Sequence, residues 1–191
     1  MPGSKPVANR KAVEHATKIG LALNCKFPKE TSFSRKSYFY PDMSKNFQIT
    51  QYEMPFAKEG HVALDKKKIR IRRIQIEEDP ARLVHVGGIG GQYVLVDYNR
   101  SGTPLVEIVT EPDFSSPKEA RRFLEELSTM LHYLGVFDPD AEGSMRCDAN
   151  ISVSETRVEI KNITGFREVE RALNYEIIRQ NNVLRRKGKI E

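Results

Sequence analysis

The spacing of apolar and polar residues along the chain predicts three helices. Residues 9–24 place apolar side chains on one helical face, and Asn9 can cap the first turn. In residues 117–134 a longer apolar stripe follows Ser116, which can form a capping box with the glutamate three residues later. Residues 166–187 carry apolar residues on one side and basic residues elsewhere. The apolar faces consist of Val13, Ala16, Gly20 and Leu23 in the first helix, of Ala120, Phe123, Leu124, Leu127, Leu131 and Leu134 in the second, and of Val169, Leu173, Ile177 and Leu184 in the third.

Runs of β-forming residues between these helices predict an antiparallel sheet. The strands do not alternate regularly with helices, so an α+β fold is expected and a parallel βαβ sheet is disfavoured. The glycines within 87–91 match neither a phosphate loop nor a dinucleotide loop, and we interpret them as a hairpin turn. Residues 93–98 and 105–109 are predicted to pair as one hairpin, and residues 145–153 and 156–161 as another.

A further strand is expected over residues 68–78, and its apolar residues change parity between Ile71 and Ile74. We therefore expect a β-bulge at Arg72 and Arg73, a device that redirects side chains near functional sites.

Three carboxylates occupy positions where a carboxylate is costly. Glu107 stands alone within the β-forming run 105–109, and Glu78 shares the strand parity of the isoleucines before it. An ionised carboxylate on an apolar face needs a cation, hydrogen bonds or a metal ion. Together with Asp148, in a polar-rich strand, these acids indicate a site that holds metal ions and phosphate.

Each acid also has a simpler structural interpretation, which the sequence leaves open. These interpretations are an ion pair of Glu78 with Arg73 or Arg82, a water-facing position for Glu107 on an edge strand, and an ion pair of Asp148 with Arg146 on one strand face.

The composition limits the class of protein. The 191 residues are 39% hydrophobic and 30% charged, which is typical of a globular domain. The net charge of +5 permits a nucleic-acid partner without requiring one. No apolar run approaches the roughly 20 residues of a membrane-spanning helix, and the spacing of Cys25 and Cys147 matches no metal motif. We therefore expect a cytoplasmic protein with reduced thiols.

Long segments of the sequence match a known family. They include RKSYFYPD (35–42), VDYNRSGTPLVEIV (96–109) and EGSMRCDAN (142–150), and further matching segments are 1–9, 48–52, 77–79, 111–113 and 157–162. In these segments, which run through nearly all of the chain, it resembles the B subunit of the glutamyl/aspartyl-tRNA amidotransferases. Strings of this length and order are far more specific than a short motif.

The resemblance implies the repair of a misacylated tRNA, which carries glutamate on the glutamine tRNA or aspartate on the asparagine tRNA. The B subunit of this family uses ATP and Mg²⁺ to phosphorylate the side-chain carboxylate of that amino acid, and ammonia then displaces the phosphate to give the amide. A glutaminase A subunit supplies the ammonia, and a small C subunit clamps A to B. The resemblance thus implies a cytoplasmic heterotrimer that serves protein biosynthesis.

The resemblance also assigns site residues. Glu78, Glu107 and Asp148 align with the acids around the Mg²⁺ site and are the expected catalytic and metal-binding residues, in agreement with the burial argument. The expected substrate- and ATP-binding residues are Lys36, Tyr38, Tyr40, Asp97, Asn99, Arg100, Arg146, Asn150 and Lys161. Because of their positive charge, Arg100, Arg146 and Lys161 are candidates for neutralising phosphate. Lys36, Tyr38 and Tyr40 are candidates for contacting the tRNA 3′ end. Whether the aromatic residues at 38–40 stack on a base or pack in the core stays open.

The segment departs from the family in its extent. Family members begin with a strand of the type Gly-x-Glu-Val-His, which is not among these residues, nor are the helical and tail domains that grip tRNA. We therefore expect residues 1–191 to form a partial catalytic cradle, a mainly antiparallel sheet with flanking helices that is incomplete at both ends and inactive in isolation. Two alternatives stay open: a non-catalytic RNA-binding or scaffold remnant, and the archaeal paralogue that acts only on Glu-tRNA.

Overall fold

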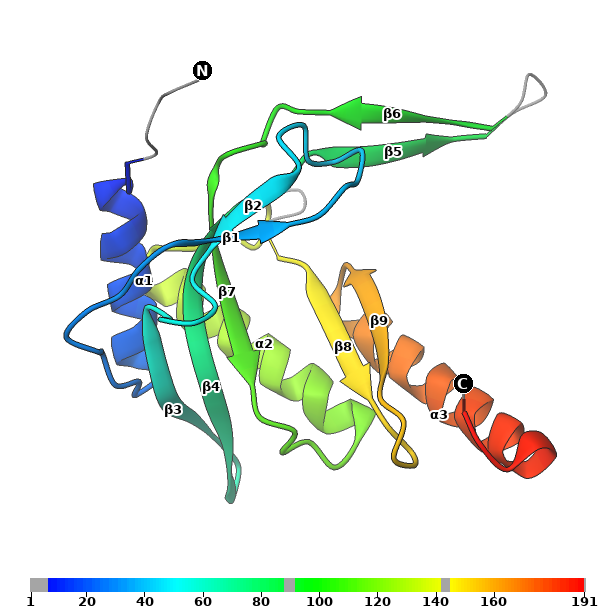
Figure 1. The fold of residues 1–191 in the computed structure, drawn as a ribbon. Helices are drawn as coiled ribbons and strands as arrows, with labels where there is room; N and C mark the ends of the chain where they lie inside the picture. The colour runs from blue at the N-terminus through cyan, green and yellow to red at the C-terminus, as the bar shows by residue number, and fades with distance from the viewer. Residues whose placement is uncertain (1–6, 88–91, 142–144, 191) are drawn as a thin grey trace. The chain divides into compact units, whose positions relative to one another are not determined.

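The computed structural model describes residues 7–87, 92–141 and 145–190 (Figure 1). The chain divides into two compact units, Met1–Glu111 and Pro112–Glu191. Every named pair of strands in the described ranges is antiparallel, and helices accompany the strands in both units. The predicted α+β class is therefore confirmed. Within the described residues, no helix is both long and apolar enough to span a membrane.

In its described residues, the first unit consists of one helix and antiparallel strands of 4 to 12 residues. Its central sheet has the order β3-β4-β7, and β1–β2 and β5–β6 form separate two-stranded pairs. The elements are α1 (Arg10–Ala22), β1 (Ser34–Ser37), β2 (Phe47–Thr50), β3 (Ala57–Leu64), β4 (Lys67–Glu78), β5 (Arg82–Val86), β6 (Tyr93–Asp97) and β7 (Pro104–Thr110).

The first predicted helix is confirmed as α1. The side chain of Asn9 accepts hydrogen bonds from the N–H groups of Lys11 and Ala12, as an N-cap does. The buried residues of α1 include Ala16 and Gly20, and the helix contacts β4 and β7. Its apolar face thus closes one side of the central sheet.

The predicted bulge is confirmed in β4. Ile71 is paired with Thr110 and Arg73 with Val109, so Arg72 is an extra residue in β4 relative to β7. The isoleucines before and after the bulge are all buried. The extra residue explains how apolar residues of both parities reach the core.

The far end of β4 is bridged to β2 by glutamine side chains. Pairing with β3 ends at Ile74, which leaves the next backbone groups on that edge of β4 without a neighbouring strand. The N–H of Ile76 donates to Gln51 Oε1 at 2.9 Å, and Gln48 Nε2 donates to the carbonyl oxygen of Glu78 at 2.9 Å. These two bonds take the place of ladder hydrogen bonds and hold β1–β2 beside the end of β4.

The predicted pairing of residues 93–98 with 105–109 is wrong. β6 pairs with β5, and β7 pairs with β4. Three of the glycines interpreted as a hairpin turn, Gly88, Gly90 and Gly91, lie outside the described residues, and the strands on either side of them pair antiparallel.

The connection between β6 and β7 explains this correction. The N–H of Asp79 donates to the carbonyl of Thr103 at 2.8 Å, and the N–H of Gly102 donates to the carbonyl of Asp79 at 2.9 Å. Gly102 has a φ of 81°, which favours glycine. These bonds hold the connection against the residue that follows β4, so β7 starts beside β4 instead of turning back on β6.

In its described residues, the second unit contains two helices and one β-hairpin, α2 (Pro117–Tyr133), β8 (Cys147–Ile151), β9 (Val158–Ile163) and α3 (Phe166–Lys187). The predicted hairpin and both helices are confirmed, with the strand bounds shifted by two residues. Ser116 Oγ accepts from the N–H of Glu119 at 3.2 Å, while the Glu119 carboxylate accepts from the N–H of Ser115 at 2.6 Å, one residue before the N-cap. Gly135, with a φ of 64°, follows the end of α2.

A small apolar core joins α3 to the hairpin. Ala149, Val169 and Leu173 are buried together, and half-buried residues of α2 and β9 pack around them. The helices α2 and α3 also contact each other.

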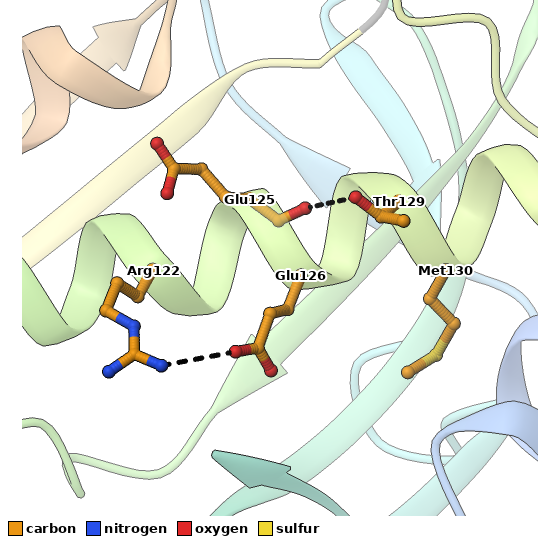
Figure 2. Close-up of a pocket in the computed structure, with 5 residues that line it drawn as sticks. All are labelled: Arg122, Glu125, Glu126, Thr129 and Met130. Atoms are coloured by element: carbon orange, nitrogen blue, oxygen red, sulfur yellow. Dashed lines mark hydrogen bonds and ion pairs between the residues drawn. The ribbon is translucent and has the colours of Figure 1, made fainter. Parts of the chain in front are cut away.

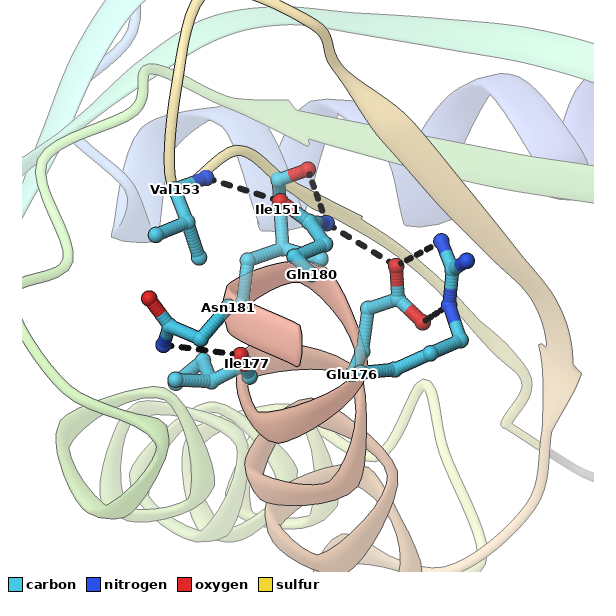
Figure 3. Close-up of polar contacts among 7 residues, drawn as sticks. Ile151, Val153, Glu176, Ile177, Gln180 and Asn181 are labelled. Carbon is cyan, nitrogen blue, oxygen red and sulfur yellow. Dashed lines mark hydrogen bonds and ion pairs between the residues drawn. The ribbon is translucent and has the colours of Figure 1, made fainter. Parts of the chain in front are cut away.

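The predicted apolar face of α3 is only partly correct. Ile177 and Leu184 are half-buried, whereas Glu176 and Gln180 are buried. Figure 3 shows the reason: the N–H of Val153 donates to Gln180 Oε1 at 2.9 Å, and Gln180 Nε2 donates to Glu176 Oε1 at 2.9 Å. A polar network at the end of β8 therefore replaces the expected apolar contact.

Candidate functional site

A pair of carboxylates joined by one amide group lies at the junction of β4 and β7. Glu107 and Gln75 are directly opposite in the antiparallel register, so their side chains lie on one face. Gln75 Nε2 donates a hydrogen bond to the Glu107 carboxylate. Glu77 has the same parity as Gln75, and the same Nε2 donates to Glu77 Oε1 at 2.8 Å. The acid that accompanies Glu107 is therefore Glu77.

Glu77 receives further hydrogen bonds from β2. Thr50 Oγ1 donates to Glu77 Oε1 at 2.5 Å, and Gln48 Nε2 donates to Glu77 Oε2 at 3.3 Å. Both residues of β2 are buried. The Glu77 carboxylate thus accepts hydrogen bonds from two neutral side chains of β2.

Two cations act on Glu107. Arg73 Nε donates to Gln75 Oε1 at 2.9 Å, and the guanidinium lies 4.7 Å from the ring centroid of Tyr52. Burial and the charge of Glu77 raise the pKa of Glu107, while the charges of Arg73 and Lys36 oppose that rise. Although Glu107 as a residue is exposed, its carboxylate therefore lies where a second negative charge is costly.

Glu78 lies on the other face of the β4–β7 ladder from Glu107, because it shares the parity of Ile76. Its side chain is 14% exposed, so the burial predicted from parity is confirmed. The N–H of Ile49 donates to Glu78 Oε1 at 2.7 Å, and Lys45 Nζ lies 2.5 Å from the carboxylate. Glu78 is thus in an ion pair, as the structural interpretation expected, but the partner found is Lys45, which was not one of the two expected arginines.

Asp148 belongs to the β8–β9 hairpin of the second unit. The N–H of Asn162 donates to Asp148 Oδ1 at 2.8 Å, and Lys161 Nζ lies 3.0 Å from Asp148 Oδ2. The same ammonium lies 3.0 Å from Glu159, so two acids balance the charge of Lys161. Asn162 has a φ of 58° and accompanies a register shift in the hairpin. The predicted residues Asp148 and Lys161 are therefore in direct contact.

Two further predicted residues share the exposed side of this hairpin. Arg146 and Asn150 occupy exposed positions on either side of Asp148, whereas Ala149 and Ile151 pack on the core. The alternation gives β8 one polar and one apolar face.

The predicted residues Asp97, Asn99 and Arg100 lie at the end of β6 and in the turn after it. Asp97 Oδ1 accepts from the N–H of Asn99 at 2.9 Å, which forms a local turn. Arg100 Nε lies 3.9 Å from Asp79 Oδ2. These side chains stabilise the connection that directs β7 to β4.

The three aromatic residues after β1 differ in exposure. Tyr38 is half-buried, and burial together with the charges of Asp42 and Glu78 raises its pKa to about 12. Phe39 and Tyr40 are 86% and 56% exposed. Of the three rings, the latter two have faces available to a ligand.

The described residues contain no group of three or more His, Cys, Asp or Glu arranged for a metal ion. Glu77 and Glu107 offer two carboxylates on one face. The roles of Glu78 and Asp148 as metal ligands stay predictions from the family resemblance.

A shallow cavity lies on the surface of α2 (Figure 2). Its volume is about 410 Å³, and its lining consists of Arg122, Glu125, Glu126, Thr129 and Met130. Thr129 Oγ1 donates to the carbonyl of Glu125 at 2.9 Å, and Arg122 Nη2 lies 3.7 Å from Glu126 Oε1. None of the predicted site residues is part of this cavity.

Gln75 and Glu77 were missed as site residues, although a signal for them exists. Arg73, Gln75 and Glu77 form a row of polar residues at every second position of β4, between buried isoleucines. Such a row predicts a polar face on a strand, but only the register with β7 shows that Glu107 lies opposite it.

Comparisons with known proteins agree with the resemblance. The family model of the GatB/GatE catalytic domain matches residues 1–190. The chain is 55% identical to the B subunit of the aspartyl/glutamyl-tRNA(Asn/Gln) amidotransferase of Methanospirillum hungatei JF-1, over 97% of the chain and 40% of that protein. The proteins of the same name in Methanosarcina mazei and Saccharolobus solfataricus are 56% and 53% identical over the whole chain, which covers 40% and 42% of their lengths. The chain thus spans about two fifths of these relatives, and it belongs to the GatB/GatE catalytic domain family.

Proposed function

We propose that this chain forms the ATP-dependent, carboxylate-phosphorylating part of a tRNA-dependent amidotransferase. The substrate is glutamate on the glutamine tRNA, aspartate on the asparagine tRNA, or both. The side-chain carboxylate attacks the γ-phosphorus of ATP and ADP leaves. Ammonia then attacks the activated acyl carbon, phosphate leaves, and the amide forms with loss of a proton. A glutaminase subunit and a small clamping subunit are the proposed partners.

The observation that carries the proposal is the charged face around Glu107 in a chain of this family. A phosphoryl-transfer site needs carboxylates for a divalent cation and cations for the phosphates. Glu107 and Glu77 supply the first, and Lys36 and Arg73 supply positive charge near them. The relatives named above are subunits of amidotransferases that act on tRNA, which supports the substrate class.

The basic residues of the first unit have a direct part in this proposal. Lys36 is exposed on β1, and its charge acts on Glu107, so it can approach a phosphate group without leaving the site. Arg73 is fixed by Gln75 and Tyr52, so its charge is available without the entropy cost of ordering a free side chain. We assign both residues to neutralising phosphate charge.

The donor set fits Mg²⁺. This ion usually binds proteins through one or two carboxylates and completes its shell with phosphate oxygens and water, and it supplies charge neutralisation on the transferred phosphoryl group. Glu77 and Glu107 match that donor number. Since burial and the charge of Glu77 raise the pKa of Glu107, a bound cation would also favour the ionised form of Glu107. Glu78 and Asp148 are further proposed ligands on the family resemblance.

The test uses the longest natural protein that contains this chain, assembled with the two proposed partner subunits. Glu-tRNA(Gln) and Asp-tRNA(Asn) are supplied separately with ATP, Mg²⁺ and glutamine, and the amino acid on the tRNA is identified after release. We expect conversion to the amide on at least one of the two tRNAs, with release of ADP. Amide formation that proceeds without ATP, or no amide formation on either tRNA, would contradict the proposal. Conversion of Glu-tRNA(Gln) alone would identify the Glu-specific form of the activity.

A further inference from the structure

Gln75 is a buried amide whose orientation is determined by its neighbours. Gln75 lies in the last third of β4, and the residue is 3% exposed. Arg73 Nε donates to Gln75 Oε1, so the oxygen end of the amide faces a guanidinium. The nitrogen end faces Glu77 and Glu107. A reversed amide would direct its oxygen at two carboxylates and its hydrogens at a cation, so one orientation is strongly favoured.

The two amide hydrogens of Gln75 serve the two carboxylates. Gln75 Nε2 carries two hydrogens and lies within hydrogen-bond distance of both Glu77 and Glu107, with Thr50 Oγ1 as a weaker neighbour at 3.3 Å. Glu77 also accepts from Thr50 and from Gln48. Loss of the amide would therefore leave Glu77 with donors from β2, but would remove the bond that holds Glu107 across the ladder.

A neutral hydrogen-bond donor suits a carboxylate that must interact with a cation or a substrate group. An arginine or lysine in place of Gln75 would neutralise Glu107 through an ion pair. The amide restricts the rotamer of Glu107 without adding charge, so the carboxylate keeps its negative charge for a cation or a substrate group. A hydrogen-bond donor on a rigid strand, such as the Gln75 amide, holds a neighbouring functional side chain in one geometry.

We propose that Gln75 is a positioning residue that orients the Glu107 carboxylate for phosphoryl transfer. The inference rests on the proposed function and extends it to a residue of β4 that acts through Glu107 rather than on the substrate. Gln75 accepts a hydrogen bond from Arg73 and lies directly opposite Glu107 in the register, so its effect is specific to this face of the sheet.

The test compares two buried glutamines in the full protein assembled with its partner subunits. Gln75→Met removes the amide at nearly constant length. Gln180→Met is the matched control, because Gln180 is also buried and also donates to a glutamate, at 2.9 Å (Figure 3). For each variant, kcat, KM for ATP, KM for the aminoacyl-tRNA and the melting temperature are measured. Gln75→His is the conservative variant, since its imidazole keeps an N–H donor.

We expect both methionine variants to lower the melting temperature, but only Gln75→Met to lower kcat, by about tenfold or more with both KM values within about twofold of wild type. Gln75→His should exceed Gln75→Met in kcat by at least about threefold. An unchanged kcat in Gln75→Met, an equal loss in Gln180→Met, or equal kcat values in the two Gln75 variants would overturn the inference. A wild-type protein that forms no amide would instead contradict the proposed function itself.

Discussion

Glu77 on β4 and Glu107 on β7 lie on the same face of the central sheet, and the amide nitrogen of Gln75 donates to both. Two carboxylates this close cannot both ionise without cost, unless donors or a cation stabilise them. Glu77 has three neutral donors, whereas Glu107 has the raised pKa. Of the two, Glu107 is therefore the carboxylate whose ionised form gains more from a nearby cation.

Replacing the Glu107 carboxylate with an amide should abolish amidation without unfolding the protein. The Glu107→Gln variant should lose at least about 100-fold in kcat, since the charge is removed while the side-chain shape is kept. Its melting temperature should equal or exceed that of wild type because the cost of burying the charge and its repulsion with Glu77 are both gone. Glu59→Gln is the control, an exposed acid of β3 paired with Lys26, and its kcat should stay within about twofold. Full activity of Glu107→Gln would refute the assignment.

Stability should fall with rising pH because of Glu107. The folded protein holds this proton more tightly than the unfolded chain does, since the pKa is raised above the ordinary value of 4.5. The contribution of Glu107 is therefore fully present below pH 4.5 and is lost as pH rises through the raised pKa. Urea unfolding between about pH 4 and 8 should show the stability of Glu107→Gln increasing relative to wild type across this range.

Glu176 serves as the control for the pH series, because its contribution to stability should depend on pH in the opposite direction from that of Glu107. The hydrogen bond from Arg179 lowers the pKa of Glu176, so its contribution is present above 4.5 and is lost as pH falls through the lowered pKa. In a series extended below pH 4.5, the stability of wild type should thus fall relative to Glu176→Gln as pH falls, and above pH 4.5 the difference between the two proteins should stay constant. The same trend in both variants would contradict the assigned shifts.

Removing the ammonium that neutralises Glu78 should destabilise the first unit. Lys45→Met leaves a carboxylate whose side chain is 14% exposed with the backbone N–H of Ile49 as a donor, and we expect a loss of about 1–2 kcal/mol in the free energy of unfolding. Chemical denaturation measures this loss. Lys26→Met is the control, because its ion pair with Glu59 joins side chains that are 74% and 55% exposed, and its effect should be below about 0.5 kcal/mol. Equal effects would show that burial of Glu78 has little consequence.

A methyl group at Gly60 should be poorly tolerated. An added Cβ would lie 2.3 Å from Cys25 Sγ and 2.5 Å from the carbonyl oxygen of Leu23, and the latter is backbone that cannot rotate away. We expect Gly60→Ala to cost about 1–3 kcal/mol or to prevent folding. Gly87→Ala provides the comparison, since no heavy atom of the described residues, apart from Gly87 and its chain neighbours, lies within 4 Å of its Cβ position. The melting temperatures of the two variants should differ clearly. Equal melting temperatures would contradict the close contact between Gly60 of β3 and Cys25.

Local signals explain which elements the sequence predicts well. Asn9 and Ser116 determine the starts of α1 and α2 through bonds to N–H groups two or three residues away. The bulge at Arg72 follows from the parity of neighbouring isoleucines in one strand. These features depend on residues close in the chain, so the sequence alone was sufficient to predict them.

Strand partners and the neighbours of each acid were decided by the tertiary structure. The sequence identified Glu107 as an acid in need of a partner. It grouped Glu107 with Glu78 in one site, but the register places Glu78 on the other face of the ladder. Gln75 lies 32 positions from Glu107 and Lys45 lies 33 positions from Glu78, so neither contact has a periodic signal in the chain. The pairing of β7 with β4 depends in the same way on hydrogen bonds between Asp79 and the turn before β7, which form only when distant segments meet. Helix caps and strand parity are properties of neighbouring residues, whereas register is a property of two segments brought together by folding, and this is why the sequence determined the acids and the structure decided their partners.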